Sequence, residues 1–155
     1  MSPRAACRLE TLGFRSVHDY VTGKADWLAR GLPTEGEHAG APRARDALRT
    51  DAVTCLLEDT MGDVRPRVEQ SPYGFALVVS SGGVVLGRLR KTAIEGDPEA
   101  SAAAVMEAGP WTVRADTELE TLMQRLTDRG LSTAIVTTPD GVLLGIVPRA
   151  RSSGQ

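Results

Sequence analysis

The sequence contains few aromatic residues and few cysteines. Phe, Tyr and Trp contribute two residues each to the 155, which is too few for a platform that stacks successive nucleic-acid bases. Basic residues number 18 and acidic residues 20, so the net charge of −2 provides no broad attraction to nucleic acid. Two cysteines make no disulfide framework, and no CxxC or Cys/His spacing of a metal site is present. We therefore predict no nucleic-acid partner and no metal.

Long apolar runs are also missing. The run 75–79 is far shorter than the ~18 residues that a membrane span needs. The N-terminus lacks the charged and apolar regions of a secretion signal. Apolar residues make up 41% and charged residues 25%, which is ordinary globular usage. We expect a soluble cytoplasmic protein without a membrane partner, with a length suited to one domain and a short appendage.

An internal repeat is the most informative feature of the sequence. A shift of 58 positions places residues 53–89 on residues 111–147 without a gap. Eight positions are then identical, including the glycine pairs Gly83/Gly141 and Gly87/Gly145, and several others keep their apolar character. Two copies make a pair of related units and not a solenoid.

Both copies predict the same order of elements. A short extended piece precedes an amphipathic segment, which is clearest in residues 119–126, where apolar residues recur at helical spacing. Two apolar runs separated by a glycine-containing turn then predict a β-hairpin. Each copy is therefore expected to be a β-α-β-β unit. The extended pieces are 53–55 and 111–113, and the hairpins are 75–80 with 84–89 and 133–138 with 142–147.

Several local signals refine this prediction. Asp116 or Thr117 is the expected N-cap of the helix in the second copy. Pro66 predicts that the helix of the first copy kinks or begins late. Residues 99–109 predict a connecting helix that Gly109 and Pro110 end.

The first 50 residues differ in character. The Ser2-Pro3 pair predicts the start of a helix that Gly13 ends, and residues 24–30 predict one or two further helical turns. Residues 17–21 are compatible with a short strand. Residues 37–50 contain few large apolar groups and predict a linker that becomes helical toward Leu48.

The repeat resembles a pair of CBS motifs, the cystathionine-β-synthase-type regulatory module. The resemblance implies an α+β fold in which tandem β-α-β-β(-α) repeats pack about a pseudo-twofold axis, here with an N-terminal helical extension. It also implies a homodimer and a cleft between the repeats for AMP, ATP or S-adenosylmethionine, with no other cofactor. We assign residues 51–98 to the first motif, 99–150 to the second and 151–155 to a tail. The resemblance is carried by Thr54, 84–87, 105–107, 109–113, 136–141 and 143–147.

The sequence departs from the ligand-binding pattern of this family after the last strand of each copy. Binding members place Thr or Ser three residues after the strand glycine, and three residues further on an Asp that accepts hydrogen bonds from the ribose. The corresponding residues here are Arg90 and Ala93 in the first copy and Pro148 and Arg151 in the second. Both ribose carboxylates are therefore missing, together with charge-assisted hydrogen bonds worth ~1.5–3 kcal/mol each.

Basic residues stand where the carboxylates are absent. Arginine forks suit phosphate groups, so we predict a cleft that favours a phosphate-bearing or acidic partner. The competing interpretation is a solvated basic rim, with threonines that satisfy only local backbone. The predicted ligand-binding residues are Thr54, Arg88, Arg90, Thr112 and Arg149.

Residues 2–36 resemble the C-terminal end of a rhodanese (sulfurtransferase) domain. Such a domain carries its persulfide on a Cys in a six-residue loop ahead of this region. Cys7 instead lies within the predicted helix, without loop glycines whose amides would lower a thiol pKa. We interpret residues 1–36 as a remnant that lacks the catalytic loop. The matching segments are Leu12-Gly13-Phe14, Val17-His18-Asp19-Tyr20, Gly23-Lys24-Ala25-Asp26-Trp27, Gly31-Leu32-Pro33 and Gly36.

The sequence therefore predicts no catalytic residues and no enzyme. The favoured hypothesis is a regulatory, ligand-sensing CBS pair with a nucleotide or other phosphate-bearing ligand in its cleft. One alternative is a structural homodimer or partner-docking module with no small-molecule ligand. A further alternative is a sulfurtransferase accessory acting through Cys7.

Overall fold

The computed structural model describes residues 3–18, 23–36 and 40–149, and the chain divides into two units, Met1–Ala41 and Pro42–Gln155. The first unit holds helix α1 (Pro3–Thr11) and helix α2 (Gly23–Ala29). Gly13 follows α1 with a φ of 93°, as expected of a residue that ends a helix. The predicted N-cap Ser2 and most of the predicted strand 17–21 lie outside the described residues.

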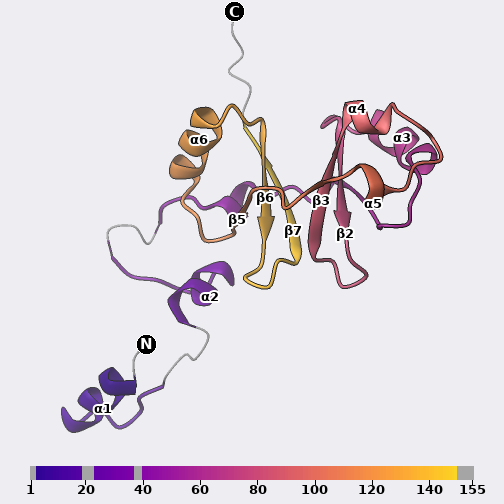
Figure 1. Cartoon of the computed structure of the whole chain (residues 1–155). Coiled ribbons are helices and arrows are strands. Elements are labelled where there is room, and N and C mark those ends of the chain that lie inside the picture. Colours follow the sequence, from indigo (N-terminus) through magenta and orange to yellow (C-terminus); the bar gives the residue numbers. More distant parts are fainter. Residues whose placement is uncertain (1–2, 19–22, 37–39, 150–155) are drawn as a thin grey trace, which may run out of the picture. The chain divides into compact units, whose positions relative to one another are not determined.

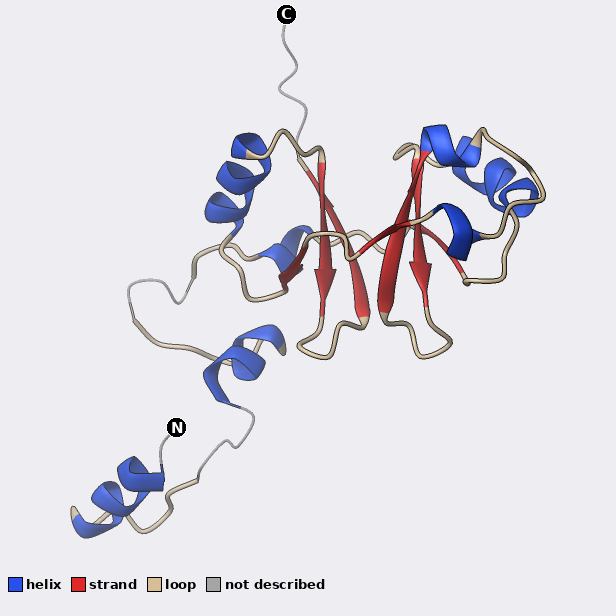
Figure 2. Cartoon of the chain, viewed as in Figure 1, coloured by secondary structure: helices blue, strands red, loops and turns tan. Residues whose placement is uncertain are grey.

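The second unit contains two β-hairpins that lie next to each other between helices (Figures 1 and 2). Its four-stranded sheet has the order β1-β2-β3-β4, and its three-stranded sheet has the order β5-β6-β7. In both sheets the first strand runs parallel to the second, and the hairpin is antiparallel. The strands are β1 (Val53–Cys55), β2 (Phe75–Val79), β3 (Val85–Arg90), β4 (Glu107–Ala108), β5 (Thr112–Arg114), β6 (Thr133–Thr137) and β7 (Leu143–Pro148).

The predicted repeat is therefore a structural repeat. The shift of 58 residues places β2 on β6 and β3 on β7 without any displacement of their ends. The hairpin tips also meet, because the Val85 amide donates to the Gly141 carbonyl at 3.0 Å and the Leu143 amide donates to the Gly83 carbonyl at 2.9 Å. The strand predictions are confirmed to within a residue or two.

The helices depart from prediction in two places. Helix α3 (Met61–Glu69) begins at the repeat equivalent of the first residue of α6 (Leu119–Asp128), so the late start predicted from Pro66 is wrong. Pro66 deprives only the carbonyl of Gly62 of its helical donor, and Gly62 is exposed, so water can reach it. Glu118 is the N-cap of α6 in place of the predicted Asp116 or Thr117, and its side chain makes no capping bond.

The predicted connecting helix 99–109 is also wrong in extent. Helix α5 covers only Ala102–Val105, and Met106 adopts extended backbone with a φ of −70° and a ψ of 147°. Glu107 and Ala108 then form β4, which pairs with β3. The sheet edge thus gains a hydrogen-bonded partner that would be lost if the helix continued. A short helix α4 (Lys91–Ile94) follows β3.

Residues 42–50, where the sequence predicts a linker, pack on the second repeat. They include the 3₁₀ helix η1 (Ala44–Ala47), whose Ala44 amide donates to the Thr117 carbonyl at 2.8 Å. The equivalent bond in the first repeat joins the Ala102 amide to the Asp59 carbonyl, also at 2.8 Å. The segment that precedes the first strand of each repeat therefore packs on the other repeat, so the two segments are exchanged. In this exchange η1 corresponds to α5.

The same exchange continues to the edge of the second sheet. Arg49 pairs with Ile146 of β7 through two bonds of 2.8 Å, in the position that β4 takes beside β3. The main core of the first repeat lies between its sheet and its helices, since alternate strand residues face α3 and α4. Its buried members are Cys55, Met61, Val64, Val68, Ala76, Val78, Leu89, Ile94 and Ala102.

Candidate functional site

The strand register decides which side chains lie between the two sheets. Leu89 of β3 faces the helical side and is buried in the core of the first repeat. Because side chains alternate along a strand, Arg88 and Arg90 face the opposite side, next to their partners Leu77 and Phe75. The predicted basic residues of the first copy therefore lie on the face turned toward the second sheet.

A cleft of about 380 Å³ lies at this position. This volume lies within the roughly 300–1,000 Å³ that is typical of small-molecule sites. The lining comes from both repeats: two residues from β3, one from β4, and the others from the start of the second repeat, the end of α6 and β6. The lining residues are Arg88, Arg90, Glu107, Pro110, Trp111, Arg129, Leu131, Thr133 and Ile135.

Arg88 is the most enclosed cation of the cleft. Its guanidinium carbon stands 4.3 Å from the centre of the Phe75 ring, a cation–π distance. Burial lowers the pKa of Arg88, as does the charge of Arg90, whereas Glu107 opposes this effect. Its buried Nε has no hydrogen-bond partner among the described residues.

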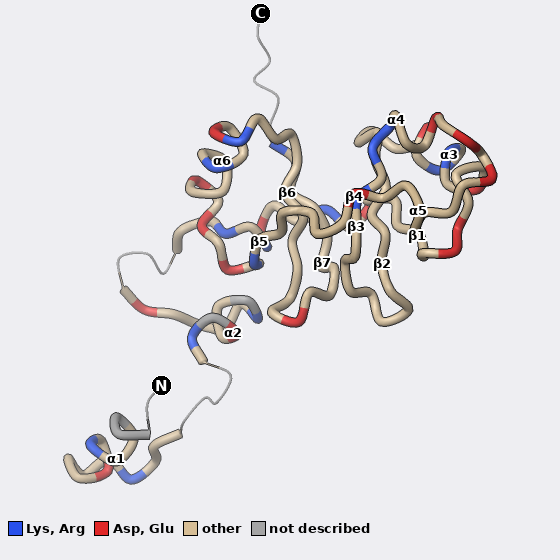
Figure 3. The backbone as a smooth tube through the Cα atoms, in the orientation of Figure 1, with Lys and Arg blue, Asp and Glu red and all other residues tan. Residues whose placement is uncertain are grey.

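Two further cations border the same space. Arg90 Nε lies 2.8 Å from Glu107 Oε2, and both side chains are more than half exposed. The guanidinium carbon of Arg129 lies 5.1 Å from the centre of the Trp111 ring. In Figure 3 basic and acidic positions adjoin where β4 lies along β3. Three arginines and one glutamate give the lining a net positive charge, with an aromatic surface beside it.

Two residues at the repeat-equivalent position are apolar and buried. Shifting the cleft by 58 residues replaces Arg88 with Ile146 and Thr133 with Phe75. Ile146 is 0% and Phe75 3% exposed, and both belong to a core cluster with Leu77 and Ile135. The two pseudo-symmetric positions therefore differ in chemistry, since Arg88 lines the cleft whereas its equivalent Ile146 is packed in a hydrocarbon cluster.

The structure brings together two of the five predicted ligand-binding residues. Arg88 and Arg90 line the cleft, whereas Thr54, Thr112 and Arg149 are not among its lining residues. Thr112 is exposed on β5, next to Trp111. Arg149 is exposed after β7, and its amide donates to the Ser132 carbonyl at 2.8 Å.

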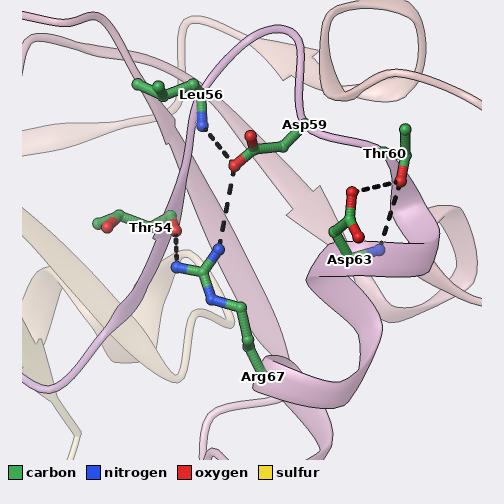
Figure 4. Close-up of polar contacts among 6 residues, drawn as sticks. All are labelled: Thr54, Leu56, Asp59, Thr60, Asp63 and Arg67. Carbon is green, nitrogen blue, oxygen red and sulfur yellow. Dashed lines mark hydrogen bonds and ion pairs between the residues drawn. The ribbon is translucent and has the colours of Figure 1, made fainter.

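Thr54 takes part in a network that fastens the end of β1 (Figure 4). Its carbonyl oxygen accepts a hydrogen bond from Arg67 Nη2. Arg67 Nη1 lies 3.9 Å from Asp59 Oδ2, which also accepts a bond of 3.0 Å from the Leu56 amide. Beside this network, Thr60 Oγ1 donates to Asp63 Oδ2 at 2.8 Å at the start of α3. The contacts of Thr54 are therefore with residues that hold β1 and α3 together.

Sequence reasoning missed Glu107, Trp111, Arg129 and Thr133 as lining residues. Trp111 lies in a motif that the repeat singles out, so a signal for it was present. Glu107 falls in a segment with a helical pattern, and Arg129 follows the last residue of α6. Nothing local to either residue indicates that it approaches β3.

The remaining chemistry-bearing groups lie elsewhere. Cys7 is exposed on α1, whereas Cys55 is buried in β1. Burial, with a smaller contribution from Asp59, raises the pKa of Cys55 to about 11. The described part of the chain contains no group of three or more His, Cys, Asp or Glu placed to hold a metal ion. None of its described helices has the length and apolar character that a bilayer crossing needs.

With this geometry established, comparisons with known proteins identify the fold. Residues 102–151 match the family model of the CBS domain. The α+β architecture is that of a CBS-domain pair. No curated protein matches the sequence, and the family match does not extend to residues 2–36, so the rhodanese-like resemblance stays a prediction.

Three solved structures illustrate the likeness. The CBS domains of a transcriptional regulator from Streptococcus pneumoniae share 20% identity at a TM-score of 0.63, over 69% of this chain and 92% of that one. The cytosolic domain of the Mg²⁺ channel MgtE, in complex with ATP, shares 23% identity at 0.63, over 79% of this chain and 49% of that one.

The third structure is the CBS domain pair of protein MJ0100 in complex with 5′-methylthioadenosine and S-adenosyl-L-methionine. It shares 13% identity at a TM-score of 0.61, over 70% of this chain and 90% of that one. The present chain thus spans about half of the MgtE domain and most of the other two.

Proposed function

We propose that the chain is a non-enzymatic regulatory module that binds a phosphate-bearing ligand, in the first instance an adenine nucleotide, in the cleft of Arg88, Arg90 and Arg129. Two of the solved structures with this fold hold adenine ligands, namely ATP in MgtE and adenosine compounds in MJ0100. Regulation would follow from a population shift, because a ligand that prefers one arrangement of the repeats stabilises that arrangement.

The observation that carries this proposal is that the guanidinium groups of Arg88, Arg90 and Arg129 line one cleft. Arginine presents planar donors that match phosphate oxygens. The family's ribose-binding Asp is replaced by Ala93, and Arg90 precedes it at the position of the hydroxyl residue. Recognition would therefore rest on phosphate contacts, with Trp111 as an apolar surface for the base.

A thermal-shift series with AMP, ADP, ATP and S-adenosylmethionine tests the proposal. A ligand at 100 times its dissociation constant stabilises the folded chain by about 2.7 kcal/mol. We expect nucleotides with phosphate to raise the unfolding midpoint, and Arg88→Gln and Arg129→Gln to reduce the effect strongly. Arg125→Gln is the matched control, because Arg125 is an exposed arginine one helical turn before Arg129 and outside the lining.

The second candidate function is a structural homodimer or partner-docking module without a small-molecule ligand. The missing ribose carboxylates and the apolar filling around Ile146 favour it. Absence of a shift with all four compounds would favour this candidate over ligand sensing.

Three further expectations from the sequence stay proposals. They are a homodimer, a cytoplasmic location and the motif boundaries 51–98 and 99–150.

A sulfurtransferase accessory role would require Cys7 to carry sulfur. Cys7 is exposed on a helix and not in a glycine-rich loop. Persulfide transfer to Cys7, detected by mass spectrometry after incubation with thiosulfate and a sulfurtransferase, would support that role.

A further inference from the structure

Glu107 is the one carboxylate among the residues that line the arginine cleft. It stands on β4, in register with Arg88 of β3, and its Oε2 accepts a 2.8 Å bond from Arg90 Nε. The residue at the equivalent position of the other copy is Arg49. A carboxylate at this position is therefore found in the arginine cleft and not at its repeat equivalent.

The position of Glu107 affects more than one cation. Arg90 shares a direct ion pair with it, and its charge also acts on Arg88, where it favours the protonated form. A phosphate group that approaches Arg90 from the cleft would compete with this carboxylate for the same N–H. The two anions would also repel each other across a few ångströms.

We propose that Glu107 is an internal competitor that sets the affinity of the cleft for anionic ligands, and that a bound phosphate displaces it from Arg90. This inference rests on the proposed function and names the residue that regulates the same site. An exposed ion pair contributes only about 0.2–1 kcal/mol, so it is weak enough to be exchanged. A phosphate brings a charge of about −1.5 to −2 and three acceptor oxygens, so it can replace the single carboxylate.

The inference separates anionic ligands from neutral ones. A neutral nucleoside does not need the N–H of Arg90 and is not repelled by a carboxylate. Removal of the charge at position 107 should therefore tighten the binding of pyrophosphate and ATP and leave that of adenosine unchanged. A purely structural role of Glu107 on β4 predicts the opposite pattern, in which all ligands lose affinity together.

Calorimetric titration of the full chain with pyrophosphate, ATP and adenosine tests this. Glu107→Gln keeps the shape of the side chain, and we expect it to tighten pyrophosphate binding about fivefold, the effect of one unit charge some 4 Å away in water-like surroundings. Glu99→Gln, an exposed carboxylate outside the lining, is the control for net charge. In an Arg90→Gln background the same change should have a smaller effect, because the pair is already broken.

The outcomes distinguish the two proposals. If the unaltered chain binds ATP and Glu107→Gln binds it equally or more weakly, the internal competitor is refuted and the proposed function stands. If Glu107→Gln binds pyrophosphate and the unaltered chain does not, the result supports Glu107 as an internal competitor that prevents pyrophosphate from binding in the unaltered cleft. If neither protein binds any of the probes, both proposals are refuted. A normal unfolding midpoint for Glu107→Gln establishes that the variant is folded.

Discussion

Replacement of Gly145 by alanine is expected to loosen the exchanged segment 42–50 from the second repeat. A Cβ at position 145 would collide with the carbonyl of Arg49, and the φ of Gly145 is 150°, where side chains are strained. Strain of this kind costs about 1–3 kcal/mol. A shift of Arg49 would also weaken its two 2.8 Å bonds to Ile146, each contributing about 0.5–1.5 kcal/mol. We expect a total loss of about 3 kcal/mol.

The repeat provides a matched control for this substitution. At the equivalent Gly87, the three atoms nearest to an added Cβ all belong to the side chain of Met106, with Sδ at 2.5 Å, Cγ at 2.9 Å and Cβ at 3.0 Å. A change of rotamer relieves the contacts with Sδ and Cγ, which leaves the 3.0 Å contact with Cβ and none with the backbone of Met106. Overpacking of that kind costs about 1–3 kcal/mol. Urea denaturation followed by circular dichroism should rank Gly145→Ala as the less stable variant by at least about 1 kcal/mol. Equal stabilities, or the reverse order, would refute the exchange of segments as the reason for Gly145.

Four further predictions concern single residues. At pH 8 Cys7 should react rapidly with iodoacetamide while Cys55 stays unmodified, and fast labelling of a Cys7→Ser variant would contradict the burial of Cys55. Since the pKa of this thiol rises from 9.0 to about 11 on folding, the free energy of unfolding should fall as pH increases above 9, and more than in Cys55→Ala. Thr60→Ala removes the N-cap side chain of α3 and should lower the free energy of unfolding by about 1 kcal/mol in urea denaturation. An unchanged urea midpoint would contradict a stabilising role of this cap. Arg65→Met leaves the carbonyls of Ile94 and Gly96 without their donor and should lower the free energy of unfolding by about 2 kcal/mol. A smaller destabilisation than that of Thr60→Ala would contradict this role of Arg65.

The hairpins could be predicted from the sequence because their signals are local. Apolar runs flank Gly83 and Gly141, whose φ values of 79° and 82° suit a tight turn. Because the same pattern occurs in both copies, a strand that is clear in one copy supports the prediction of the equivalent strand in the other. Arg88 and Arg90 could be named as site residues because they stand near the end of the first hairpin, where the CBS-like pattern places its ligand contacts.

The exchanged segments could not be predicted in the same way. Residues 42–50 contain few large apolar groups, and their partners, such as Thr117 and Ile146, lie about 70 to 100 residues further along the chain. Residues 106–108 have a helical composition, and only pairing with β3 makes Glu107 extended. Arg129 reaches the cleft because α6 ends beside Trp111, a relation that no local pattern contains.

Fluorescence of Trp111 during titration with ATP tests the central claim most directly. The sequence has two tryptophans, and Trp27→Phe leaves Trp111 in the cleft as the sole reporter. We predict a saturable change in its emission that follows calorimetric binding with one ATP per chain, and its loss in Arg88→Gln. Binding of two ATP molecules per chain, binding without any response of Trp111, or no binding at all would contradict a single arginine cleft as the ligand site.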